Sequence, residues 1–137
     1  MLTLSRTQRG TVIAACIRAL PDEGCGLLVG RINGADATVV EVVGSRNVAS
    51  SARVYEVDPL VLLRTVRRVE REGLSVLGVF HSHTHSEAYP SDTDVRQAPD
   101  PTWHYVIVSL RDVPSSIRSF RVRGDSVDEE DLYIEER

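Results

Sequence analysis

The sequence of 137 residues contains no lysine, only two cysteines and no long apolar run. No segment approaches the roughly 20 apolar residues that a membrane-spanning helix needs, so we expect neither a transmembrane helix nor a membrane partner. The first residues lack a basic region followed by an apolar stretch, so no secretory signal is expected. Without lysine, all 16 basic residues are arginine, which we attribute to coding bias and not to chemistry.

The charge distribution argues against a nucleic-acid-binding protein. The formal net charge is −4, and residues 125–137 alone hold seven carboxylates and one arginine. Residues 1–124 therefore carry 13 carboxylates against 15 arginines, a balance of about +2. Nucleic-acid-binding domains concentrate many more basic residues than this, so we expect no nucleic-acid partner.

The two cysteines, Cys16 and Cys25, both lie in apolar surroundings. Their number and setting predict buried, reduced thiols and a cytoplasmic location. A disulfide between them remains an alternative. Neither thiol lies near the histidines in the sequence.

The length and composition are typical of a single globular domain, which we expect to span residues 1–137. We expect helices over residues 6–20 and 59–72, and strands over residues 26–30, 37–43, 75–81, 104–110 and 116–123. This alternation predicts an α/β fold in which helices flank a single sheet.

Local signals set several of these boundaries. The first helix is followed by Pro21, and the second begins after Asp58 and ends before Gly73. Asn33-Gly34 predicts a hairpin turn between two strands. Apolar residues spaced three or four apart predict the buried faces of the helices. They are Val12, Ile13, Cys16, Ile17 and Leu20 in the first, and Leu60, Leu63, Val66 and Val69 in the second.

The most informative segment is 81–94, which holds three of the four histidines. His81 and His83 stand where an apolar strand runs out, which predicts a position at the edge of the sheet. Residues i and i+2 of a strand share a face with Cα atoms roughly 7 Å apart, so both imidazoles can reach one ion. Asp94, one turn into a short helix expected after Pro90 and Ser91, can point back at them. Three protein ligands and one open position are typical of catalytic zinc.

Each element of this pattern also has an ordinary explanation. His-x-His occurs by chance in solvated loops, and Ser91 with Asp94 resembles a capping box. The joint pattern is more specific, because His83 and Ser91 are separated by seven residues and Ser91 and Asp94 by two. Ser91 can cap a helix and still face a metal ion. His85 is a competing ligand, whereas His104 is expected to be packed or at the surface.

Hydrolysis at a metal site also needs a base to take a proton from water. Glu23 is the first candidate, because it stands just before a buried strand, where an acid can overhang the end of the sheet. Its neighbour Asp22 is not distinguished from it by composition alone.

These residues together resemble the signature of the JAMM (MPN-plus, Mov34/MPN/PAD-1) zinc metallopeptidases. The resemblance rests on Glu23 with the segment 25–30, on His81-Ser82-His83, and on Pro90-Ser91-x-x-Asp94. It covers nearly the whole chain and is closest to the prokaryotic branch that acts on ubiquitin-like sulfur carrier proteins. The segments 87–91 and 104–109 resemble peptidases of this branch that free cysteine from a carrier.

The resemblance implies a JAB1/MPN fold, similar to cytidine deaminases, with a mixed sheet. It implies His81, His83 and Asp94 as ligands of Zn²⁺, Glu23 as general base and acid, and Ser91 as a donor to the oxyanion. Many relatives have proline at the position of Thr84, a departure that affects the shape of the loop. The 84–90 loop has no room for the insertions of eukaryotic deubiquitinases, which argues against cleavage of polyubiquitin.

The function implied is hydrolysis of the bond after the C-terminal Gly-Gly of a ubiquitin-like sulfur carrier protein, for example with release of cysteine. The alternative is a non-catalytic MPN-type module that binds a ubiquitin-like protein. A zinc nucleoside deaminase would need a Cys-x-x-Cys motif, which this sequence lacks.

Two further features have more than one explanation. The second helix carries arginines that can dock an acidic carrier or form a solvated face, namely Arg64, Arg67, Arg68 and Arg71. Tyr55 and Tyr89 can flank an extended Gly-Gly tail or pack inside the protein. The sequence does not set the oligomeric state.

Overall fold

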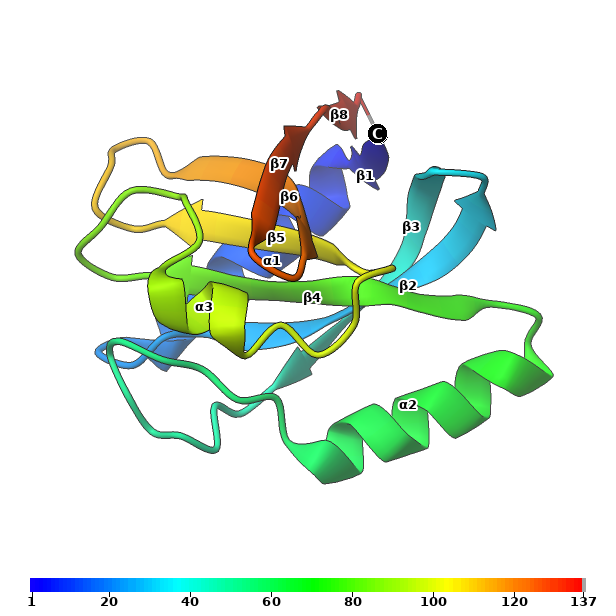
Figure 1. Ribbon diagram of the computed structural model, residues 1–137, viewed down its shortest axis with the longest axis horizontal. Coiled ribbons are helices and arrows are strands. Elements are labelled where there is room, and N and C mark those ends of the chain that lie inside the picture. Colours follow the sequence, from blue (N-terminus) through cyan, green and yellow to red (C-terminus); the bar gives the residue numbers. More distant parts are fainter. Residues whose placement is uncertain (137) are drawn as a thin grey trace.

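The computed structural model describes residues 1–136; Arg137, the last residue of the expected domain, lies outside the described residues. These residues form one sheet with the strand order β7-β6-β5-β4-β2-β3-β1-β8 (Figure 1). From the N- to the C-terminus the elements are β1 (Leu2–Ser5), α1 (Arg6–Ala19), β2 (Cys25–Asn33), β3 (Asp36–Ser45), α2 (Pro59–Arg71), β4 (Ser75–His83), α3 (Asp92–Arg96), β5 (His104–Ser109), β6 (Ser116–Arg123), β7 (Ser126–Glu130) and β8 (Leu132–Glu135).

The sheet is mixed, as expected for this α/β fold. Its central strand β4 pairs antiparallel with β2 and parallel with β5. Strand β1 lies parallel to both β3 and β8. The parallel pairing of β4 and β5 requires a crossover, and the chain between them contains α3.

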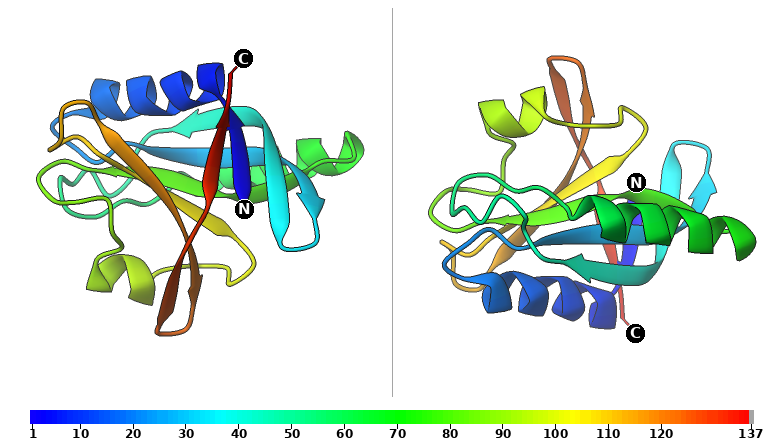
Figure 2. Two further views of the ribbon diagram at one scale, coloured as in Figure 1. Left: turned by 90° about the horizontal axis from the view of Figure 1, so that it is seen from above. Right: turned by 90° about the horizontal axis from the view of Figure 1, so that it is seen from below.

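Helices cover both faces of the sheet (Figure 2). Helix α1 packs on one face, where Val12 and Cys16 join a buried cluster with Leu28, Phe80 and Val106. Helices α2 and α3 lie on the other face. The buried residues of the cluster on that face are Leu27, Val79, Ala88, Tyr105, Ile107, Phe120 and Val122. The candidate site belongs to this second face.

Several local predictions are confirmed. The predicted hairpin between β2 and β3 is present, but its two turn residues are Gly34 and Ala35, because Asn33 still pairs with Asp36; Gly34 has a φ of 62°. Helix α2 begins with Pro59 after the N-cap Asp58, and Gly73 follows it with a φ of 70°. A left-handed residue after a helix is most easily supplied by glycine.

The buried faces of both long helices were predicted incorrectly in part. On α1, Ile17 is 51% exposed, and Leu20 lies beyond the helix and is 47% exposed. On α2, Leu60 and Leu63 are 49% and 46% exposed. Residues one position away pack on the second cluster instead, namely Val61 and Leu62. An offset of one residue turns a helix face by about 100°, so the contact line of α2 differs from the predicted stripe.

The expected strands are present, but their lengths and number differ. Strand β2 extends to Asn33, beyond the predicted residues 26–30, and β4 continues through His83. Strands β1, β7 and β8 were not predicted. Strand β7 lies in the acidic segment 125–137, and most of its side chains face solvent, so no apolar pattern marked it as a strand.

Strand β7 is joined to the interior by a buried ionic contact. Glu130 accepts hydrogen bonds from His104 Nδ1 at 2.6 Å and from the Ser119 hydroxyl at 2.7 Å. Burial alone would raise the pKa of Glu130, but these two hydrogen bonds lower it below its usual value. His104 is therefore a packed histidine that holds the edge of the sheet.

Replacing Glu130 should weaken the fold without touching the candidate site. We expect Glu130→Ala to lower the free energy of unfolding by about 3–5 kcal/mol, because His104 loses its buried partner. The adjacent Glu129 pairs with Arg118 at the surface, so Glu129→Ala should cost at most about 1 kcal/mol. Urea denaturation at pH 7 measures both. Equal effects of the two variants would contradict the structural role of Glu130.

Candidate metal centre

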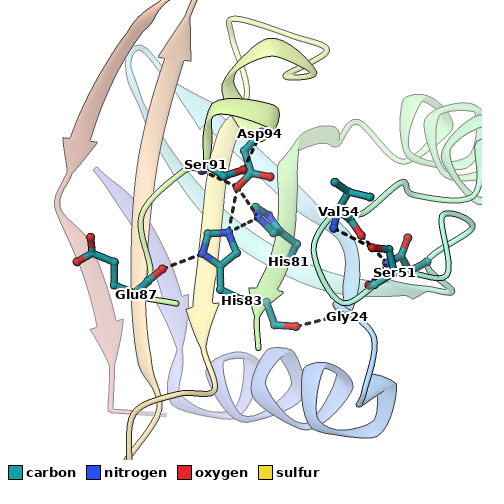
Figure 3. A network of polar contacts seen from close by, with 10 residues as sticks. Gly24, Ser51, Val54, His81, His83, Glu87, Ser91 and Asp94 are labelled. Carbon is teal, nitrogen blue, oxygen red and sulfur yellow. Dashed lines mark hydrogen bonds and ion pairs between the residues drawn. The ribbon is translucent and has the colours of Figure 1, made fainter. Parts of the chain in front are cut away.

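Three side chains proposed as ligands converge at the carboxyl end of β4 (Figure 3). Asp94 Oδ2 lies 3.1 Å from His81 Nε2 and 3.0 Å from His83 Nε2, and the two imidazole nitrogens are 3.2 Å apart. No other His, Cys, Asp or Glu among residues 1–136 belongs to this group. His85 is exposed and stands outside it.

The strand fixes the two imidazoles. Side chains alternate along β4, so His81 and His83 share the second face of the sheet with Val79. Ser82 points the other way and accepts a hydrogen bond from the Gly24 amide at 2.8 Å. The histidines were expected at the edge of the sheet, but β4 lies between β2 and β5, and they are only 1% and 4% exposed.

The start of α3 fixes the carboxylate. The Ser91 hydroxyl accepts a hydrogen bond from the Asp94 amide at 3.0 Å, and Asp94 Oδ2 accepts one from the Ser91 amide at 3.0 Å. This reciprocal pair is the expected capping box. Because the same oxygen also faces both imidazoles, capping and convergence occur together.

The geometry fits a divalent metal ion. With bonds of about 2.0–2.1 Å, two ligand atoms of a tetrahedral zinc ion lie about 3.3–3.4 Å apart, close to the spacing found here. His83 Nδ1 contacts the Glu87 carbonyl at 2.7 Å, so this nitrogen carries the proton and leaves the Nε2 lone pair free to bind a metal. Two imidazoles and a carboxylate form a ligand set that binds divalent transition metals.

The charges of the three groups depend on one another. Burial alone would raise the pKa of Asp94, but hydrogen bonds from His81 and His83 lower it well below its usual range. Burial lowers the pKa of His81. Although burial opposes it, hydrogen bonds to Asp94 and to the Glu87 carbonyl raise the pKa of His83. The carboxylate is therefore anionic across the physiological pH range.

Glu23 enters the same region from the segment before β2. It is 3% exposed, and it lines a cavity together with His83 and Ser91. Burial raises its pKa to about 8, and its Oε1 atom is buried without a hydrogen-bond partner among the described residues. Asp22 is partly exposed and does not line this cavity. The structure thus distinguishes two acids that the sequence did not.

The position of Glu23 depends on close packing of its neighbour. A Cβ atom on Gly24 would lie 2.7 Å from the Cα of Cys16 in α1, so only glycine allows this approach. The Glu23 amide donates a hydrogen bond to the Ser51 carbonyl at 2.8 Å. Helix α1 and the loop after β3 together hold the Glu23 backbone.

No sequence pattern indicated that the loop 47–54 borders the site. The Asn47 side-chain amide donates hydrogen bonds to the carbonyls of Glu23, Ser51 and Val54 at 2.9–3.3 Å. Its oxygen accepts from the amides of Ala49 and Glu56. One side chain therefore determines the course of this loop.

The residues considered for binding a carrier protein, namely two tyrosines and the arginines of α2, differ in their contacts. The Tyr55 ring stacks on the His81 imidazole at 4.1 Å, whereas Tyr89 packs edge-on against Phe120 and is 44% exposed. Arg68 on α2 pairs with Glu41 at 2.9 Å. Tyr55 is thus the tyrosine that touches the candidate ligands.

Both cysteines are free and buried, as expected. Cys25 nevertheless pairs across the strands with His81, which its distance in sequence did not suggest. Its sulfur points to backbone carbonyls at 3.7–3.9 Å. Burial raises the pKa of both thiols to about 12, and neither sulfur belongs to the convergent group of His81, His83 and Asp94.

Comparison with known proteins agrees with this geometry. Residues 8–123 match the family of prokaryotic homologs of the JAB domain. The CysO-cysteine peptidase of Mycobacterium tuberculosis is 36% identical over 127 residues, covering 92% of this chain and 86% of that protein. A protein from Desulfitobacterium hafniense, solved in solution, superposes with a TM-score of 0.92 at 38% identity, over 100% of this chain and 94% of that one.

The fold extends to more distant proteins. A JAB1/MPN domain protein from Archaeoglobus fulgidus has a TM-score of 0.62 at 20% identity, over 98% of this chain and 95% of that one. The range of the family match, residues 8–123, contains Glu23 and the segment 81–94. By its sequence, its sheet and its convergent side chains, the chain belongs to the prokaryotic JAB domain family.

Proposed function

We propose that this protein is a zinc-dependent peptidase that hydrolyses the bond after the C-terminal Gly-Gly of a ubiquitin-like sulfur carrier protein, for example with release of cysteine. The similarity to a CysO-cysteine peptidase over 92% of the chain supports this substrate class. The observation that carries the chemistry is the convergence of His81, His83 and Asp94 beside a cavity lined by Glu23.

In this proposal His81, His83 and Asp94 hold the ion. Zinc supplies Lewis acidity and makes hydroxide available near neutral pH. Glu23 takes a proton from the attacking water and passes it to the leaving amine. The oxygen of Ser91 accepts from the Asp94 amide, so the Ser91 proton remains available for a hydrogen bond to the oxyanion.

The environment of Glu23 suits this role. Its raised pKa places proton uptake and release near neutral pH, where a general base is most effective. A neighbouring cation favours the carboxylate, so the pKa should fall when the ion is bound. The alternative of a non-catalytic MPN-type binding module gives no reason for a buried acid without a hydrogen-bond partner beside the ligand group.

Two further expectations belong to this proposal. We propose that residues 1–137 act as one catalytic domain, and that it works in the cytoplasm, which suits two free thiols. Within residues 1–136, no helix has the length and apolar character needed to cross a membrane.

Metal binding should depend on His83 and not on His85. We expect His83→Ala to lose stoichiometric zinc because one of three ligands is removed, whereas His85→Ala, at an exposed position, should retain it. Metal analysis of the purified proteins under reducing conditions measures this. Zinc lost from the His85 variant and kept by the His83 variant would reverse the assignment of ligands.

Glu23 should be required for turnover but not for zinc binding. We expect Glu23→Gln to reduce kcat for a carrier–cysteine adduct by about 10²–10⁴-fold, because the amide cannot accept the proton. Asp22→Asn is the matched control and should retain activity, since Asp22 lies outside the cavity. Undiminished turnover by the Glu23 variant, with zinc bound, would rule out this base.

The metal-free protein should reveal the cost of burying Glu23. Its pKa is raised from 4.5 to about 8 in the folded state, so the folded protein binds the proton more tightly than the unfolded chain. Stability therefore falls as the pH rises through this range. Between pH 6 and pH 9 the wild type should lose about 2–3 kcal/mol more than Glu23→Gln. Urea denaturation in the presence of a chelator tests this, and parallel pH profiles would contradict it.

A further inference from the structure

Two cavities reach the candidate metal centre, and they have no lining residue in common. The larger, of about 430 Å³, is mainly apolar and borders Asp94, Tyr55 and Trp103. The smaller, of about 280 Å³, is lined by Glu23, Ala52, Arg53, His83, Thr84, His85, Ser86 and Ser91. A substrate cleaved at the metal centre has an acyl half and an amine half, so one cavity can hold the acyl half and the other the amine half.

The chemistry of hydrolysis decides which half enters the smaller cavity. Water adds its oxygen to the carbonyl carbon of the last glycine, the C–N bond breaks, and the departing nitrogen receives a proton. In the proposed function Glu23 delivers this proton, so the departing nitrogen must lie beside Glu23. Because Glu23 lines only the smaller cavity, that cavity receives the released residue.

The size of this cavity limits the residue. Sites for small ligands usually measure about 300–1,000 Å³, so 280 Å³ lies just below that range. Seven of the eight residues that line it are polar or charged, whereas most of the residues that line the larger cavity are apolar. A single amino acid, with its charged groups, suits this space better than a folded protein joined through a lysine side chain.

Arg53 provides a charge for such a residue. It is the only arginine of this cavity, its side chain is exposed, and its guanidinium has no ion pair or hydrogen bond within residues 1–136. A guanidinium presents paired donors that match the two oxygens of a carboxylate. An unpaired arginine beside the leaving-group position is therefore suited to bind an anion.

The backbone of Arg53 is held in place on both sides. Its amide donates a hydrogen bond to the Ser51 hydroxyl at 3.0 Å, and the Ser51 carbonyl accepts from the Glu23 amide at 2.8 Å. The Thr84 hydroxyl donates to the Ala52 carbonyl at 3.2 Å. The loop that carries Arg53 is thus attached to the segment of Glu23 and to the end of β4, and Figure 3 shows the hydrogen bond between Ser51 and Val54 within this loop.

We propose that Arg53 binds the α-carboxylate of a single amino acid attached to the C-terminus of the carrier, so that the enzyme releases a free amino acid in preference to cleaving a lysine isopeptide. This inference rests on the proposed function. A lysine within a protein chain has no free α-carboxylate to offer. Arg53 is a binding residue in this account, and it selects the kind of bond that is cleaved.

The test compares two substrates that differ only in the charged group. A carrier extended by one cysteine is prepared with a free α-carboxylate and with a C-terminal carboxamide. We expect the wild type to show about 10- to 100-fold higher kcat/KM for the carboxylate, mainly through KM. Arg53→Met should remove this preference by slowing only the carboxylate substrate, and Arg53→Lys should restore part of it.

A matched control keeps the measurement specific. Arg123 is exposed and stands at the far end of β6, near the start of β5, so Arg123→Met should leave both rates unchanged. Equal rates of the wild type on both substrates, or equal slowing of both by Arg53→Met, would overturn the assignment of Arg53. Faster cleavage of the same carrier joined to a lysine side chain would overturn it as well.

Binding without turnover separates this inference from the proposed function. In the Glu23→Gln protein, the carboxylate carrier should bind more tightly than the carboxamide carrier, with Kd values that differ by the same factor as the kcat/KM values. Adding Arg53→Met should make the two Kd values equal. If the wild type cleaves none of the substrates, the proposed function is wrong. Equal Kd values for the two carriers in the Glu23→Gln protein, with Arg53 intact, would refute the carboxylate site without any measurement of turnover.

Discussion

One carboxylate oxygen connects the parts of this site. Asp94 Oδ2 accepts a hydrogen bond from the Ser91 amide in the capping box of α3, and it also faces the two imidazoles at the end of β4. A short helix and a central strand are thereby fixed relative to each other. Folding, and not metal binding, supplies the free energy that holds the three polar groups together, because the capping box orients the carboxylate before any ion binds.

The parts of the site that could be predicted are those encoded over short distances. The His-x-His spacing gives two side chains on one face of a strand, and the Ser91–Asp94 spacing gives a capping box; both depend only on local geometry. The order of helices and central strands followed from turn residues and apolar runs. The resemblance to a known family then connected Glu23 with the ligands.

The parts that could not be predicted depend on residues distant in sequence. Nothing local indicates that Cys25 lies beside His81, or that Glu23 is buried while Asp22 is not. Strand β7 was not predicted, because its buried contact, from Glu130 to His104, joins residues 26 positions apart. The inward faces of α1 and α2 were misassigned in part, because packing against a twisted sheet, and not helix periodicity alone, decides which apolar side chains are covered.

The loop held by Asn47 has an entropic consequence for recognition. The Asn47 side chain donates to three backbone carbonyls and accepts from two backbone amides, so five hydrogen bonds order this segment. A binding rim that is already ordered loses little conformational freedom when a flexible peptide tail arrives, so less of the contact energy is consumed in immobilising the protein. Such a rim leaves more of the contact energy as affinity for the tail.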